Sequence, residues 1–289
     1  MNRRELLKLS SALTWRAQSP GRRAVPARLR TALCAYSFRE ALQAGRMTYQ
    51  DLVRYAVEHR LDGLDLTVYW FPTPLSEQWL LELKRAAYRN AVEIYSLSIR
   101  TEMTRPTAEL RRKEVEEIQR WVDVAALLGA GHIRVFGGRV PPGAGEQQAA
   151  GWAAEVLAQG AEYAGRKGVI LGLENHGGIT DRAETIVEIV RRVNSPWAGI
   201  NLDTGNFRSN VYEQIRMCLP YAVNAQLKSQ IRDDSGQVRE SDWERIFALF
   251  AEAGYRGYLA LEYEAKEPPQ TAVPRLLARL RELAAKYSA

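Results

Sequence analysis

Cysteine is scarce in this chain, which has two in 289 residues. Cys34 and Cys218 are too few for a disulfide scaffold, and neither belongs to a CxxC motif or to another spacing typical of metal sites. The sequence therefore excludes a fold held by disulfides and a zinc site made of cysteines. Both residues are expected to be buried thiols.

Positive charge is also scarce once the N-terminus is set aside. The chain carries a net charge of +6, but residues 1–30 hold eight Arg or Lys and one Glu, a net +7, so residues 31–289 sum to −1. A protein that binds a phosphate backbone needs a basic surface on its folded body. We therefore expect no nucleic-acid partner.

Long apolar runs are missing beyond the N-terminus, so no membrane partner is expected. Residues 2–8, Asn-Arg-Arg-Glu-Leu-Leu-Lys, resemble a twin-arginine export signal, but the apolar stretch after them is short and further arginines follow it. A working signal would make the protein periplasmic or exported. The alternative, a disordered basic tail, would leave it cytoplasmic.

Linkers and low-complexity blocks are absent after residue 30, where apolar runs typical of strands alternate with segments of helical spacing. We expect strands at 31–37, 63–67, 92–98, 132–136, 169–174, 198–203, 222–227 and 257–262. We expect helices at 49–59, 77–90, 108–128, 147–166, 182–193, 212–217, 242–253 and 273–287. This pattern predicts an α/β fold, a (β/α)8 TIM barrel that forms a single domain over residues 31–289. A doubly wound sheet is disfavoured because no GxGxxG follows the first strand.

Four consecutive strands finish on a side chain that bears an oxygen: Glu174, Asp203, Gln226 and Glu262. A buried strand cannot carry a charge in its middle, so these groups belong at strand ends. Barrels of this kind build their active sites at the carboxyl ends of the strands. We therefore expect the four side chains to meet at one rim.

The three histidines separate by the same rule. His59 lies near a helix end and His132 at a strand start, so both are expected to be structural, whereas His176 lies just past the fifth strand. A zinc site of several histidines is excluded. His176 is expected to bind a substrate hydroxyl or to move a proton, with a structural hydrogen bond as the alternative.

Any one of the rim carboxylates could simply pair with a nearby Arg or Lys. Together, three of them would repel one another, since unit charges about 4 Å apart cost about 4 kcal/mol at a surface-like dielectric. A divalent ion held by Glu174, Asp203, Gln226 and Glu262 is the simplest remedy. Four oxygen donors favour Mn²⁺ or Mg²⁺ over zinc.

These motifs resemble the sugar-phosphate isomerase/epimerase-like family of xylose isomerase-type TIM barrels, which includes ketose 3-epimerases, inosose dehydratases and the barrel subunits of C-glycoside-cleaving enzymes. The resemblance runs from about Thr31 to the C-terminus and rests on residues 172–176 (Gly-Leu-Glu-Asn-His), 201–206 (Asn-Leu-Asp-Thr-Gly-Asn), 226–228 (Gln-Leu-Lys) and 261–262 (Leu-Glu). It implies Mn²⁺, or Mg²⁺ or Co²⁺, on the rim ligands. Gln226 and Asn206 stand where the family usually has histidine.

The resemblance implies an isomerase or epimerase that forms an enediolate, with Glu174 and Glu262 as base and acid. The loops after the seventh and eighth strands lack a phosphate cradle, so a non-phosphorylated ketose or keto-sugar is expected. The alternatives are cleavage of a 3-keto-glycoside and a non-catalytic sugar-binding barrel. The protein could also form a homo-oligomer. The residues expected to contact the sugar are His176, Arg134, Lys228, Asn206, Tyr36 and Trp70. For Arg134, Lys228 and Arg100, pairing with the rim carboxylates is the alternative.

Overall fold

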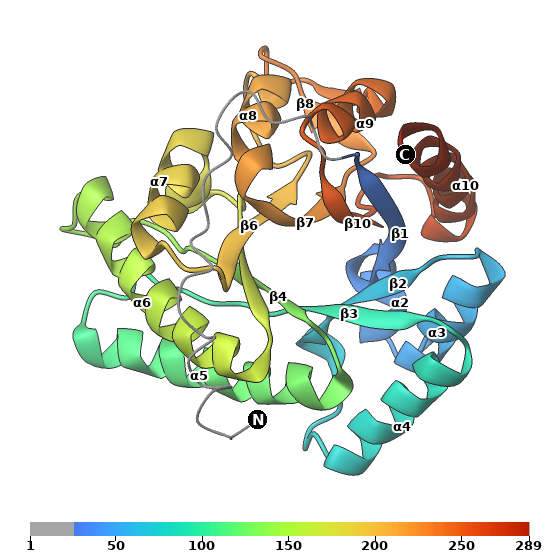
Figure 1. Cartoon of the computed structure of the whole chain (residues 1–289), viewed down its shortest axis with the longest axis horizontal. Coiled ribbons are helices and arrows are strands. Elements are labelled where there is room, and N and C mark those ends of the chain that lie inside the picture. Colours follow the sequence, from blue (N-terminus) through green and yellow to red (C-terminus); the bar gives the residue numbers. More distant parts are fainter. Residues whose placement is uncertain (1–25, 289) are drawn as a thin grey trace, which may run out of the picture.

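The computed structural model describes residues 26–288, which fold around a closed barrel of parallel strands. The strands follow one another around the barrel in chain order, and helices ring its outside (Figure 1). They are β1 (Arg28–Cys34), β2 (Gly63–Thr67), β3 (Glu93–Ser98), β4 (His132–Phe136), β5 (Ile170–Glu174), β6 (Ala198–Asp203), β7 (Ala222–Leu227) and β10 (Arg256–Leu261). Pairing of β1 with β10 closes the barrel and confirms the predicted TIM barrel.

The helices fill the connections between strands. They are α2 (Arg39–Gln43), α3 (Tyr49–Glu58), α4 (Glu77–Arg89), α5 (Ala108–Leu128), α6 (Glu146–Lys167), α7 (Ala183–Val193), α8 (Val211–Cys218), α9 (Trp243–Glu252) and α10 (Pro269–Tyr287). Short 3-10 turns are η1 (Ala35–Phe38), η2 (Val68–Trp70), η3 (Gly178–Thr180) and η4 (Leu219–Tyr221). None of the helices within residues 26–288 is long and apolar enough to cross a membrane.

Local sequence signals set several helix ends. Thr48 and Asp51 form a capping box that starts α3, with the Asp51 amide donating to the Thr48 hydroxyl at 3.1 Å. Helices α5 and α6 stop at Gly129 and Gly168, whose φ angles of 85° and 74° suit glycine and end a helix. These ends deliver the chain to β4 and β5, which carry part of the rim.

The first strand begins three residues earlier than predicted. The Arg28 amide donates to the Tyr255 carbonyl at 2.9 Å, and β1 pairs with β10 from Arg28 onward. Its basic side chains hid it in the sequence, because Arg30 points outward and bonds Glu93 at 2.7 Å. The predicted start of the first strand at Thr31 is therefore corrected to Arg28, while the export-signal prediction for residues 2–8 lies outside the described residues.

A small antiparallel pair was not predicted. Strands β8 (Gln230–Arg232) and β9 (Val238–Glu240) form a hairpin in the connection between β7 and α9, beside the barrel. The sequence there is polar and acidic, and it reads as a loop because each strand is only three residues long.

The interior of the barrel divides into an apolar base and a polar upper part. Ala32, Cys34, Tyr95 and Ala260 form a small buried cluster inside the barrel, separate from the main core between strands and helices. Tyr95 stacks on Tyr258 there, with ring centroids 3.6 Å apart. Above this cluster, toward the carboxyl ends of the strands, the inward positions are polar and charged.

Candidate active site

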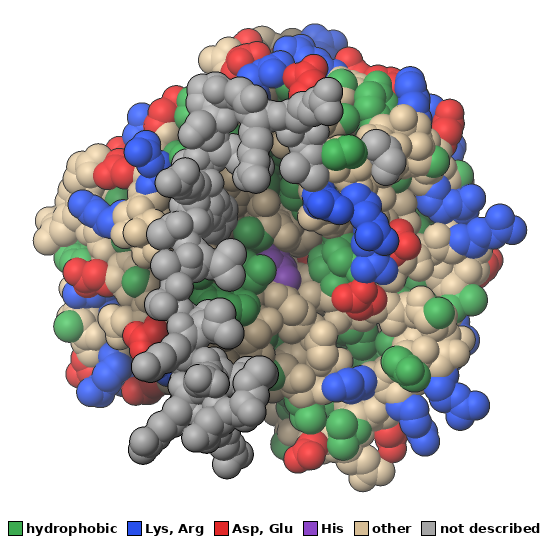
Figure 2. Space-filling view, viewed as in Figure 1, with side chains coloured by type: hydrophobic (Ala, Val, Ile, Leu, Met, Phe, Trp, Pro, Cys, Tyr) green, Lys and Arg blue, Asp and Glu red, His purple; other side chains and the backbone are tan. Residues whose placement is uncertain are grey.

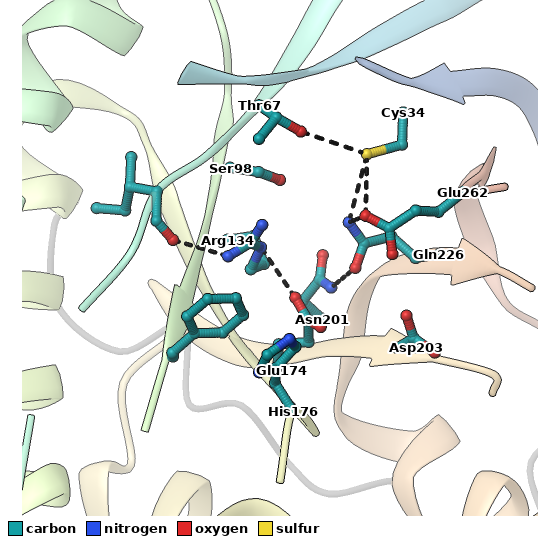
Figure 3. A network of polar contacts seen from close by, with 12 residues as sticks. Cys34, Thr67, Ser98, Arg134, Glu174, His176, Asn201, Asp203, Gln226 and Glu262 are labelled. Atoms are coloured by element: carbon teal, nitrogen blue, oxygen red, sulfur yellow. Dashed lines mark hydrogen bonds and ion pairs between the residues drawn. The ribbon is translucent and has the colours of Figure 1, made fainter. Parts of the chain in front are cut away.

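The strand ends meet as expected at the carboxyl end of the barrel. Glu174 ends β5, Asp203 ends β6, Gln226 lies one residue before the end of β7, and Glu262 directly follows β10. All four side chains are buried and converge on the barrel axis (Figure 3). Because burial strips these groups of water, each needs a partner within the protein.

Arg134 is the partner of Glu174. It projects inward from β4, and its Nε lies 2.9 Å from Glu174 Oε2, with the two side chains 3% and 2% exposed. Its Nη1 donates to the Ile99 carbonyl at 2.7 Å and to the Tyr69 hydroxyl at 3.2 Å. The guanidinium also lies over the Phe136 ring, 4.1 Å from the centroid. Arg134 is thus fixed from several sides.

Lys228 is the partner of the other two carboxylates. Its Nζ lies 2.6 Å from Glu262 Oε2 and 3.4 Å from Asp203 Oδ2, and it also contacts the Glu264 carboxylate. The Lys228 side chain is 9% exposed. Of the two interpretations left open for Arg134 and Lys228, this arrangement is the one in which they pair with the rim carboxylates.

The Gln226 side chain points its amide nitrogen at acids. Its Nε2 donates to Asp65 Oδ2 at 3.2 Å and to Glu262 Oε1 at 3.5 Å, while its Oε1 accepts from Asn201 Nδ2 at 2.8 Å. Asn201 in turn accepts from Asn224 Nδ2 at 2.8 Å. Ionised carboxylates only accept hydrogen bonds, so the amide nitrogen of Gln226, and not its oxygen, must face them. The oxygen of Gln226 therefore faces away from the carboxylates.

The surroundings of the three carboxyl groups give them different pKa values. Burial raises the pKa of Glu174 against the pull of Arg134, and burial raises that of Asp203 to about 7 although Lys228 opposes the shift. Burial also acts on Glu262, but Lys228 and Arg134 outweigh it and lower its pKa. Glu262 is therefore the carboxylate held ionised, and Glu174 takes up a proton more readily.

The remaining predicted contact residues lie around this centre. Asn206 Nδ2 donates to Glu174 Oε1 at 3.1 Å, and His176 stacks on Phe136 with ring centroids 4.0 Å apart. Burial and Arg134 lower the pKa of His176 to about 4, so its ring is neutral near pH 7. His132, predicted to be structural, is buried below with its Nδ1 2.8 Å from the Ser96 hydroxyl.

Some aromatic residues line the central cavity, and Trp70 packs against one of them. Tyr36 lines the central cavity, whereas Trp70 stacks on Tyr36 at 5.9 Å and is not among the residues of the cavity wall. Trp70 therefore supports Tyr36 in this structure, and its contact with a sugar stays a prediction. Arg100 lies over the Tyr69 ring at 4.1 Å, and both of these residues line the cavity.

Four buried polar residues below the rim were not predicted to belong to the site: Asp65, Asn201, Asn224 and Cys34, which was expected only to be a buried thiol. Asp65 accepts from the Ser98 hydroxyl at 2.8 Å, and the Cys34 thiol donates to Glu262 Oε1 at 3.3 Å. The signal that could have found Asp65 and Asn201 is a polar residue inside an apolar strand, as in Leu-Asp-Leu at 64–66 and Ile-Asn-Leu at 200–202. Such a residue must point into a polar barrel interior.

Two cavities meet at this rim. The central one, of about 200 Å³, is lined by Tyr36, Tyr69, Arg100, Arg134, Phe136, Glu174, His176, Asn206, Lys228, Glu262 and Glu264. A second, of about 690 Å³, shares Arg100, Phe136 and His176 with it. Figure 2 shows the molecule hollowed near the middle of this face, with a histidine side chain at the bottom of the hollow. The centre therefore opens sideways into a larger cleft.

The predicted metal ligands can be tested against this arrangement. Within residues 26–288, no group of three His, Cys, Asp or Glu side chains is placed so that it could hold a metal ion. Each of the three carboxylates already contacts a side-chain cation, and the Gln226 oxygen is engaged by Asn201. The donor set as arranged does not fit a divalent ion.

Comparison with known proteins agrees with the fold. A family model described as a xylose isomerase-like TIM barrel matches residues 53–283, so the chain belongs to that family. No curated protein matches the sequence.

Three similar solved structures are informative. A D-psicose 3-epimerase in the presence of D-fructose is 14% identical with a TM-score of 0.70, covering 89% of this chain and 97% of that one. A 3-keto-D-glucoside 4-epimerase from E. coli is 16% identical with a TM-score of 0.69, covering 89% and 99%. The IOLI protein with a bound zinc atom is 14% identical with a TM-score of 0.72, covering 89% and 97%. At these identities the likeness shows the fold.

Proposed function

We propose that this protein is an isomerase or epimerase of a non-phosphorylated ketose or keto-sugar, acting by removal of the proton α to the carbonyl. The observation that carries the proposal is a pair of carboxyl groups, Glu174 and Glu262, which line one polar cavity together with Arg134 and Lys228. The family of the chain and the two epimerases among the similar structures support it.

The two carboxyl groups have different roles in this proposal. Glu262, held ionised by Lys228, accepts the proton from the substrate carbon. Glu174 must itself carry a proton at this stage, which burial favours by raising its pKa, and it returns that proton to the substrate carbon. The electron pair of the broken C–H bond forms the enediolate, whose negative oxygen lies near the two cations. Asn206 orients Glu174 through its hydrogen bond to Oε1.

Metal dependence is the part of the expected chemistry that the donor set does not support. A divalent ion on Glu174, Asp203, Gln226 and Glu262 would polarise the sugar carbonyl. To hold it, Lys228 would have to leave Glu262 and Asp203, and Gln226 would have to turn its oxygen inward. The proposed proton transfer therefore uses the side chains of the chain alone.

One observation favours a second candidate, cleavage of a 3-keto-glycoside. The cavity of about 690 Å³ beside the centre leaves room for a group attached to the reacting sugar, beyond what a single ketose would fill. Proton abstraction α to the keto group would then expel the aglycone from the β carbon. The same carboxyl groups serve both reactions.

Incubation in D₂O separates these reactions. The protein is incubated with D-fructose and, separately, with a 3-keto-glucoside, and both are followed by proton NMR. Loss of the α-proton signal with appearance of a rearranged or epimerised sugar is the expected result, while release of the aglycone would favour cleavage. Binding without exchange of the α proton in either sugar would overturn the proposal and leave a sugar-binding barrel.

A further inference from the structure

Lys228, the last residue of the Gln-Leu-Lys motif, lies in an environment that the sequence did not predict. Its ammonium lies among acids from the end of β6 and from the segment that follows β10: Asp203 Oδ2 at 3.4 Å, Glu262 Oε2 at 2.6 Å, and Glu264 in direct contact. Three carboxylates around one charge is the environment that a metal ion would have. Here a lysine occupies it.

Lys228 is built into this position and is not a surface side chain that happens to reach in. Its amide donates to the Thr204 hydroxyl at 3.0 Å, and its carbonyl accepts from the Trp243 indole at 2.9 Å. A Cβ on Gly205 would lie only 2.6 Å from the Lys228 Cγ, so the neighbouring backbone leaves room for the lysine stem only because residue 205 is glycine.

Gln226, which was also predicted to be a metal ligand, instead makes hydrogen bonds to neighbouring side chains. The Gln226 amide nitrogen donates toward Glu262, and the Asn201 amide holds its oxygen (Figure 3). The same nitrogen also donates to Asp65. Turning the amide would set its oxygen against two carboxylates and break the bond to Asn201. Gln226 therefore acts as a donor that ties acids together.

Arg134 completes the set of charges. It pairs with Glu174 on the other side of the cavity, and both Arg134 and Lys228 line that cavity. Two side-chain cations supply the same +2 charge that a divalent ion would bring. They are also hydrogen-bond donors held in place by buried partners, which is the arrangement that stabilises a developing oxyanion.

We propose that the Lys228 ammonium, together with the Arg134 guanidinium, takes the place of the divalent metal ion in this protein. This inference rests on the proposed function for its chemistry. The substrate C–H bond breaks, its proton passes to Glu262, and its electron pair becomes the carbon–carbon double bond of the enediolate. The carbonyl electrons move to the oxygen, which accepts a hydrogen bond from Lys228, and protonation by Glu174 reverses these movements.

Metal binding provides a test that does not depend on the substrate. The full chain is treated with chelator, and its metal content and melting temperature are measured with and without Mn²⁺, Mg²⁺, Co²⁺ or Zn²⁺. We expect sub-stoichiometric metal and no rise in melting temperature beyond about 1 °C. A stoichiometric ion or a clear rise with any of these metals would overturn the proposal, whatever the sugar result.

Variants give the second arm. Lys228→Met removes the charge and frees Asp203 and Glu262, so this variant, and more so its combination with Gln226→His, should gain a metal-dependent rise in melting temperature. Lys266→Met is the matched control at an exposed position after β10 and should behave as the wild type. If the melting temperature of Lys228→Met does not respond to metal, the carboxylates do not form an ion site once the lysine is removed, and the inference fails.

Activity gives the third arm once a substrate is found. The wild type should keep its rate of α-proton exchange in chelator, Lys228→Met should lose it, and Lys228→Arg should recover part of it. Loss of exchange on chelation would overturn the inference and leave the proposed function standing. No exchange with any sugar would remove the proposed function and leave the metal measurements interpretable.

Discussion

Arg134 and Glu174 form a buried ion pair across neighbouring strands, with Arg134 Nε 2.9 Å from Glu174 Oε2. Neither charged group can be hydrated by water in place of its partner, because the two side chains are only 3% and 2% exposed. Each residue is therefore costly without the other, because an unpaired buried charge keeps its full desolvation penalty. The pair holds one of the two carboxyl groups of the proposed reaction in place.

The stability of this pair is open to a double-mutant cycle. Arg134→Met leaves Glu174 without its cation, and we expect a loss of about 3–5 kcal/mol in the free energy of unfolding. The double variant Arg134→Met with Glu174→Gln should lose less than the sum of the single changes. Urea unfolding followed by circular dichroism measures all four proteins. Additive losses would show that the two groups do not interact as an ion pair.

Glu262→Gln tests the proposed base. The change keeps the size of the side chain but removes its negative charge, so turnover should fall by about 10²–10⁴-fold. The fold should survive, because Lys228 keeps its contacts with Asp203 and Glu264. The rate of α-proton exchange and the melting temperature are measured together, with Glu282→Gln on the exposed face of α10 as control. Activity near that of the wild type would exclude Glu262 as the base.

The positions of Glu174 and Asp203 followed from the sequence because a charged side chain at the end of an apolar strand can reach the rim of the barrel. Glu174 and Asp203 both close apolar runs, and parallel pairing of β5 with β6 brings their strand ends to one rim. The barrel itself followed from the alternation of strand and helix patterns. These features are local, and one strand at a time suffices to see them.

The charge partners could not be predicted in the same way. Whether Lys228 meets a sugar or Glu262 depends on the closure of β10 against β7, which no single segment encodes. The amide of Gln226 is oriented by Asn201 on the neighbouring strand, and register decides that contact. Since repulsion among carboxylates is relieved equally by a metal or by basic side chains, the sequence could not choose between them.

His176 is expected to contribute to rate and not to fold. It lines both cavities and stacks on Phe136, so His176→Ala should lower kcat by about 10-fold while the melting temperature stays close to that of the wild type. Because its pKa is about 4, the neutral ring does not titrate between pH 5 and 9. The pH profile of kcat/KM in this range should keep its shape in the variant. A lost acid limb would show that His176 titrates in the free enzyme.

Truncation separates the tail from the first strand. We expect a chain that begins at Pro26 to fold and keep its activity, since β1 is complete in it. A chain that begins at Thr31 should be destabilised, because it lacks the Arg28 bond to Tyr255 and the Leu29 amide bond to the Ser288 hydroxyl. Melting temperatures of both chains check this. Equal stability would mean that the first three residues of β1 add nothing to barrel closure.

His132 makes a pH-dependent contribution to stability. Burial, helped by Arg134, lowers its pKa to about 3, whereas an unfolded histidine takes up its proton near pH 6.5. Between these values the unfolded chain binds more protons than the folded one, so the contribution is complete above about pH 6.5 and is lost progressively as the pH falls toward 3.

His132→Gln should therefore flatten the acid side of the stability profile. Glutamine can keep a hydrogen bond to the Ser96 hydroxyl, which lies 2.8 Å from His132 Nδ1, but it has no proton to gain in this range. Melting temperatures measured from pH 8 down to pH 4.5 should fall less steeply in the variant than in the wild type. Parallel slopes would mean that His132 does not enter the folded barrel as the neutral ring, and that other buried groups cause the acid sensitivity.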